Sequence, residues 1–234
     1  MQRRAYFSFV LGACALALAS PATAQDLTIG TANSNNVFPF QNYRTSLPNR
    51  YQQVYSAGAF GSSIFIDAVR FGNTVYGGTI NRGEYLVRLS TTPAPVDGLS
   101  TDFEANLGGN TTTFFSGILS GGARIAGLPF LYDPSLGNLL LDVTVFSQEN
   151  RSAEPFDADN DMGDAISRVA VYSFGEGPVT ADSYGLVTTF ETRPGSLPDS
   201  TVPEPVSMTL VGTGLAGLGM LRRRRKGRER EDQA

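Results

Sequence analysis

The amino-acid sequence predicts an all-β domain, an antiparallel β-sandwich or jelly roll, followed by one transmembrane helix near the C-terminus. Between residues 25 and 190, short runs rich in β-branched and aromatic residues alternate with clusters of Gly, Asn, Asp and Pro. No long stretch in this region has the periodicity of an amphipathic helix. Short strands separated by turns at regular intervals are typical of antiparallel sandwiches.

Eight segments have the composition of strands. They are residues 26–31, 51–57, 63–71, 84–91, 112–119, 139–146, 168–174 and 184–190. In the fourth segment Arg88 faces away from an inward row formed by Tyr85, Val87 and Leu89. This alternation predicts one buried face.

Two further segments contain enough apolar residues to predict how they face. In 139–146, Asp142 and Thr144 lie opposite a row that comprises Leu139, Leu141, Val143 and Val145. In 63–71 the apolar residues occupy both faces, with Ile64 and Ile66 on one and Phe65, Val69 and Phe71 on the other. We therefore expect the strand at 63–71 to be covered on both sides.

The N-terminus has the three parts of a secretory signal peptide. Arg3 and Arg4 give a positive start, residues 5–19 are apolar, and the small residues Ala22 and Ala24 place cleavage before Gln25. A retained anchor fits less well because polar residues interrupt the apolar run too early. Lipoprotein processing at Cys14 also fits less well, because the residues after Cys14 remain apolar.

The charge is unevenly distributed along the chain. Residues 25–204 contain nine arginines, no lysine and 19 acidic residues, which gives a net charge of −10. Nucleic-acid binding requires clustered cations, so this region is not expected to bind nucleic acid. Cys14 is the only cysteine, and its removal with the signal peptide would leave no disulfide or cysteine-based metal site.

The C-terminus predicts a tether, an apolar helix and a cytoplasmic tail. Residues 191–202 are rich in proline, and residues 206–221 carry no charge. Sixteen helical residues span about 24 Å against a hydrocarbon core of about 30 Å, so this helix is a short membrane span. Arginines next to such a helix stay in the cytoplasm; the predicted anchor comprises Arg222, Arg223, Arg224 and Arg225.

The motif Pro203-Glu204-Pro205, the glycine-bearing apolar helix and the basic terminus together resemble the PEP-CTERM sorting signal of Gram-negative bacteria. This tail is also described as an ice-binding-protein C-terminal motif, a label that carries no evidence of ice binding. The resemblance implies recognition by an exosortase, cleavage near the motif, and association with exopolysaccharide or biofilm matrix.

The segments RYQQVYSAGAF, YLVRLSTT and FLYDPSLGNLLLDVTV also resemble an uncharacterised domain often found upstream of such a tail. The expected organisation is a signal peptide (1–24), an ectodomain (25–190), a linker (191–202), a sorting signal (203–226) and a cytoplasmic tail (227–234).

Most catalytic machinery is excluded from the predicted ectodomain, which has no His, Cys or Lys. Ser-His-Asp and Cys-His nucleophiles, zinc sites of the His or Cys kind and lysine-containing phosphate loops all need these residues. Paired carboxylates could still hydrolyse glycosides. The candidates are Glu84, Glu104, Asp142, Glu149 and Glu154, although nothing in the sequence indicates that any two face each other.

An acidic run at residues 157–164 is the one candidate metal site. Asp157, Asp159 and Asp161 place oxygen atoms at alternate positions, which suits Ca²⁺. The run departs from an EF-hand, because Met162 stands where glycine is needed and Arg168 where the bidentate glutamate would be. The sequence is compatible with a calcium site and with a solvated polar loop.

Exposed tyrosines are the candidate platforms for sugar rings, because the apolar face of a sugar stacks on an aromatic ring. The candidates are Tyr43, Tyr51, Tyr55, Tyr76 and Tyr132. We expect a non-enzymatic surface or matrix protein that is exported by the Sec machinery and signal peptidase, held transiently in the inner membrane, and able to bind polysaccharide. The alternatives are a secreted carboxylate-dependent glycoside hydrolase and a calcium-stabilised structural module; no cofactor other than calcium is expected.

Overall fold

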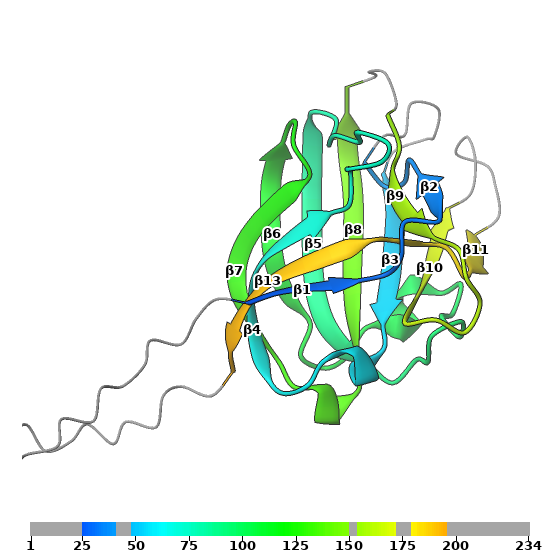
Figure 1. The fold of residues 1–234 in the computed structure, drawn as a ribbon. Helices are drawn as coiled ribbons and strands as arrows, with labels where there is room; N and C mark the ends of the chain where they lie inside the picture. Colours follow the sequence, from blue (N-terminus) through cyan, green and yellow to red (C-terminus); the bar gives the residue numbers. More distant parts are fainter. Residues whose placement is uncertain (1–24, 41–47, 150–153, 172–178, 196–234) are drawn as a thin grey trace, which may run out of the picture.

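The computed structural model describes residues 25–40, 48–149, 154–171 and 179–195, which form an all-β, sandwich-like domain with antiparallel sheets (Figure 1). The first sheet has the order β1-β13-β4-β7 and the second the order β11-β10-β3-β8-β5-β6. A small third sheet, β12-β9-β2, lies at one end beside β10 and β3. The prediction of an all-β domain is therefore confirmed.

The strand bounds are as follows. They are β1 (Gln25–Ile29), β2 (Ser34–Asn36), β3 (Asn49–Tyr55), β4 (Ile64–Phe71), β5 (Gly83–Thr92), β6 (Thr112–Leu119), β7 (Arg124–Tyr132), β8 (Asn138–Gln148), β9 (Phe156–Asp159), β10 (Ile166–Val171), β11 (Val179–Asp182), β12 (Gly185–Leu186) and β13 (Thr188–Pro194). Three short 3-10 helices connect them: η1 (Ala57–Ala59), η2 (Phe103–Asn106) and η3 (Pro134–Leu136).

The main core lies between the four-stranded and six-stranded sheets. The predicted inward rows of β5 and β8 are confirmed, since all seven side chains are buried in one cluster. Aromatic rings from both sheets complete it, with Tyr55 packed edge-on against Phe190 and Phe60 against Tyr132. In this way residues far apart in the sequence bury a shared apolar interior.

A second, smaller core covers the outer face of the six-stranded sheet. Val54, Leu140 and Val169 point outward from three adjacent strands and are covered by Leu99, which belongs to the connection between β5 and β6. Strand β8 is therefore buried on both faces, which explains why Asp142 on its outer face is only 1% exposed.

A bulge in β4 changes the direction in which its side chains face, compared with the prediction for residues 63–71. The pairing of β4 with β7 shifts register between Ile66 and Ala68. Because the shift reverses the alternation, Ile66 lies in the same core as Val69 and Phe71. Phe65 instead lies beneath the guanidinium group of Arg193, 4.0 Å from the ring centre.

The predicted strand at 184–190 is two strands in different sheets. Strand β12 pairs with β9, while β13 pairs with β1 and β4. Val187 lies at the switch, where its backbone N–H donates to Asp157 and its carbonyl accepts from Gly72. The backbone groups between the sheets therefore remain hydrogen-bonded.

Strand β13 continues to Pro194, four residues beyond the expected end of the ectodomain at residue 190. Thr192 pairs with Gln25, and Arg193 pairs with Phe65. Glu191 accepts two hydrogen bonds from Arg124, both 2.7 Å long. Proline is tolerated at Pro194 because it is the last residue of the strand.

The expected transmembrane helix at 206–221 lies outside the described residues. Within the described ranges, no helix has the length and apolar character needed to cross a bilayer.

Candidate ligand-binding site

Two carboxylates of the predicted acidic run, Asp157 and Asp159, are buried and hydrogen-bonded. Asp157 lies on β9 and is 2% exposed. Its carboxylate accepts hydrogen bonds from the backbone N–H groups of Thr74, Val75 and Tyr76 and from the Thr74 hydroxyl, at 3.0 to 3.4 Å. These donors fasten the 73–77 turn to β9, and they occupy both oxygen atoms that calcium would need.

Asp159 is also buried and occupied. It accepts from the Thr31 N–H at 2.6 Å, from the Asn33 amide at 3.0 Å and from the Asp161 N–H at 3.1 Å. The described ranges contain no group of three or more His, Cys, Asp or Glu side chains placed to hold a metal ion. In this geometry the buried carboxylates of Asp157 and Asp159 act as caps for backbone N–H groups.

The carboxylates considered for glycoside hydrolysis are engaged with arginines or exposed. Asp142 and Glu104 both contact Arg50, at 2.6 and 2.5 Å, so a guanidinium group stands between them. Glu149 pairs with Arg82 at 2.8 Å. Glu84 and Glu154 are exposed. None of these contacts builds the facing pair that hydrolysis requires.

Asp142 is instead the centre of a buried polar network. Its two oxygens accept from the Nε atoms of Arg50 and Arg88, at 2.6 and 2.7 Å. The Gln52 amide donates to the same carboxylate at 2.9 Å and to the Phe103 carbonyl at 2.9 Å. This network attaches the η2 segment to the outer face of the sheet.

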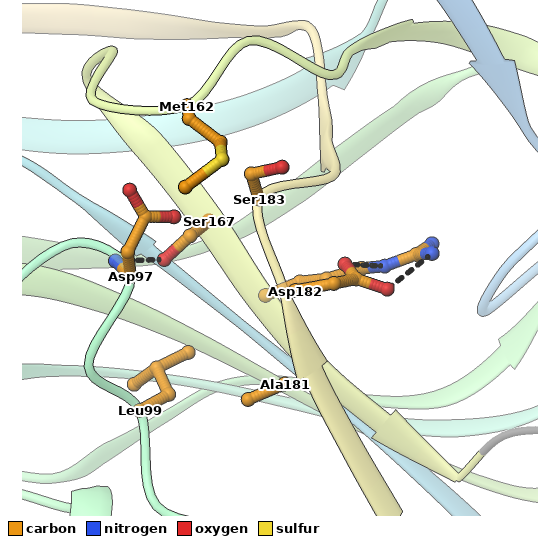
Figure 2. Close-up of a pocket in the computed structure, with 8 residues that line it drawn as sticks. Asp97, Leu99, Met162, Ser167, Ala181, Asp182 and Ser183 are labelled. Atoms are coloured by element: carbon orange, nitrogen blue, oxygen red, sulfur yellow. Dashed lines mark hydrogen bonds and ion pairs between the residues drawn. The ribbon is translucent and has the colours of Figure 1, made fainter.

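A hollow lies beside this face, between strands β10 and β11 and two loops (Figure 2). It has a volume of about 300 Å³. Leu99 and Ala181 are its apolar residues at one side, and Met162, which is 85% exposed, reaches toward it from the loop after β9. The polar lining consists of Asp97, Ser167, Arg168, Asp182 and Ser183.

Arg168 is the buried centre of the site. Its Nε and one terminal nitrogen donate to the two oxygens of Asp182, at 2.8 and 3.2 Å. The Tyr184 ring lies 4.9 Å from the guanidinium carbon. Burial, a two-pronged ion pair and cation–π contact together fix this side chain.

A second hollow of about 200 Å³ shares Arg168 with the first. It is lined by Asn35, Asn36, Val37, Phe38, Arg168 and Tyr184. The two hollows thus combine amide, hydroxyl, carboxylate and guanidinium groups with one half-buried tyrosine ring.

Asp164, in the loop that carries Met162, has an unusual protonation equilibrium. Burial raises its pKa to about 6, assisted by the negative charges of Asp159 and Asp97, although a hydrogen bond from the Ile166 N–H opposes the rise. One oxygen of Asp164 is buried and accepts no hydrogen bond. The raised pKa means that Asp164 takes up a proton more readily in the folded protein than in the unfolded chain.

The predicted aromatic platforms are largely core residues. Tyr51, Tyr55 and Tyr132 are at most 1% exposed, and Tyr76 is half-buried. Tyr43 lies outside the described residues. Sequence reasoning missed Tyr184 as a site residue because it adjoins an apolar strand, and its position against Arg168 depends on the pairing of β10 with β11.

The residues of the sorting motif (203–205), the arginine anchor (222–225) and the cleavage residues Ala22 and Ala24 lie outside the described ranges. Gln25 is the first residue of β1, and its carbonyl accepts from the Thr192 hydroxyl at 2.8 Å. Comparison with protein-family models, curated proteins and solved structures finds no match to this chain.

Proposed function

We propose that the chain is an exported, non-enzymatic protein of the cell surface or extracellular matrix whose jelly-roll-like β-sandwich binds polysaccharide. The N-terminal signal peptide and the composite C-terminal tail support export and sorting. The absence of His, Cys and Lys from residues 25–204 supports a binding role over nucleophilic chemistry.

The proposed route has two steps at the membrane. The Sec machinery exports the chain, and signal peptidase cleaves before Gln25. Residues 206–221 then hold the domain at the inner membrane, with Arg222 to Arg225 on the cytoplasmic side. An exosortase cleaves near Pro203-Glu204-Pro205 and passes the domain to the surface or matrix.

The observation that carries the binding role is the pair of hollows that share Arg168. Sugars present hydroxyl groups around a ring with an apolar face, so their sites combine polar side chains with an aromatic or aliphatic surface. Asn35, Ser183 and Asp182 supply polar groups here, and Tyr184 supplies a ring. A chain of linked sugars can contact both hollows.

Co-sedimentation of the exported protein with insoluble polysaccharides, combined with a reducing-sugar assay, tests this proposal. We expect retention on at least one polysaccharide without release of reducing ends, and we expect Tyr184→Ala to weaken retention about tenfold. Phe146→Ala is the control, since Phe146 is 46% exposed on β8 outside both hollows. Release of reducing ends, or no retention on any polysaccharide, would contradict the proposal.

A further inference from the structure

The charges around the larger hollow are only partly balanced. Arg168 and Asp182 form a two-pronged ion pair and contribute no net charge. Asp97 has no cationic partner among the described residues: one of its oxygens accepts from the Gly163 N–H at 3.1 Å, and the other accepts no hydrogen bond from any of them. One carboxylate oxygen of Asp97 is therefore left available at the edge of the hollow (Figure 2).

The position of Asp97 is fixed by its neighbours. Its backbone N–H donates to the Ser167 hydroxyl at 2.7 Å, which ties the loop to β10. Its φ of 60° lies in the left-handed region, which aspartate and asparagine tolerate better than most residues. The carboxylate is thus presented by an ordered loop, and Asn can replace Asp at this position without disturbing the backbone.

The remaining lining suits one sugar ring. Leu99 and Ala181 give an apolar surface, Ser183 gives a hydroxyl group, and the exposed Met162 side chain can cover the ring from the side of the loop. Together with Asp97, these groups match a pyranose that carries one positively charged substituent.

We propose, on the basis of the polysaccharide-binding function, that this hollow binds an amino sugar with a free ammonium group, held by the Asp97 carboxylate. The ligand class is a polysaccharide with unacetylated amines. A charge-assisted hydrogen bond to Asp97 favours such a sugar over its N-acetylated form. Uronic-acid polymers are disfavoured because residues 25–204 carry a net charge of −10.

Calorimetric titration of the exported protein with three oligosaccharides tests the inference: a glucosamine oligomer, its fully N-acetylated counterpart and an oligogalacturonate. We expect the glucosamine oligomer to bind about tenfold more tightly than the acetylated one, and we expect no binding of oligogalacturonate. Raising the salt concentration should weaken binding of the glucosamine oligomer and leave the acetylated one nearly unchanged.

Asp97→Asn should abolish the tenfold preference for the glucosamine oligomer over the acetylated one. Glu84→Gln is the matched control, because it removes the same charge from an exposed position on β5 outside the hollow. Equal affinities for the two oligomers in the wild-type protein, or a preference that survives Asp97→Asn, would overturn the inference and leave the proposed function standing. If none of the three oligomers binds, and no polysaccharide is retained in the co-sedimentation assay, both the inference and the proposed function are overturned.

Discussion

Asp164 shows how one residue makes the fold sensitive to pH. Its pKa is about 6 in the folded protein and near the ordinary value of 3.8 in the unfolded chain. The folded state therefore binds the proton more tightly, and the stabilisation is complete below pH 4 and is lost as the pH rises through 6.

Asp164→Asn should remove this loss of stability with rising pH, because an asparagine side chain stays neutral at any pH. The side chain is half-exposed and solvent screens the interaction, so we expect the variant to gain about 1 kcal/mol over the wild type between pH 4 and pH 8. Urea unfolding of both proteins across this range measures the difference. A difference that does not grow with pH would contradict the raised pKa of Asp164.

Asp142 is the buried counter-ion of two arginines, and its removal should therefore be costly. Asp142→Asn leaves Arg50 and Arg88, which are 18% and 22% exposed, without their buried counter-ion. We expect a loss of about 3–5 kcal/mol in the free energy of unfolding. The control Glu104→Gln removes an exposed partner of Arg50 and should cost less than about 1 kcal/mol. Similar losses in the two variants would contradict the assignment of Asp142 as the centre of the network.

At the scale of elements, β13 decides where the domain ends. Deleting residues 191–195 removes the Glu191–Arg124 ion pair, the Arg193–Phe65 contact and the pairing of Gln25 with Thr192. A chain ending at residue 190 should melt about 10 °C below one ending at residue 195. Circular dichroism of the two fragments measures this. Equal melting temperatures would support a domain boundary at residue 190.

The elements with clear alternation were predictable from sequence, and those that depend on distant partners were not. Strands β5 and β8 were correctly oriented because their inward rows are continuous. Strand β7 was missed because Gly127 and Pro129 interrupt its pattern. The strand tolerates both residues. Gly127 allows close approach to the Phe114 carbonyl. Pro129 lies on an edge strand, where the pairing with β4 is irregular.

The candidate site was less predictable than the fold. The sequence indicated Asp157 and Asp159 as candidate calcium ligands, but it did not show the hydrogen-bond donors that they meet more than 80 residues away in the chain. Arg168, Asp182 and Tyr184 come together only through the pairing of β10 with β11 and the turn that follows it. A single sequence contains no signal for such a pairing.

At the scale of the whole molecule, the carboxylates that could have bound calcium are already occupied by backbone donors. The melting temperature of the exported protein should therefore stay within about 1 °C when EDTA replaces millimolar calcium, because only a ligand that binds the folded state raises it. Scanning calorimetry in the two buffers provides the comparison. A clear increase with calcium would reinstate a metal-stabilised domain.

The central claim is that the two apolar ends of the chain are removed at different stages of export. Mass spectrometry of the mature protein recovered from its host tests this most directly. We predict a chain that begins at Gln25 and ends near Pro203-Glu204-Pro205, and that therefore lacks the arginines at 222–225. Recovery of the intact chain of 234 residues from the cytoplasm would contradict the account.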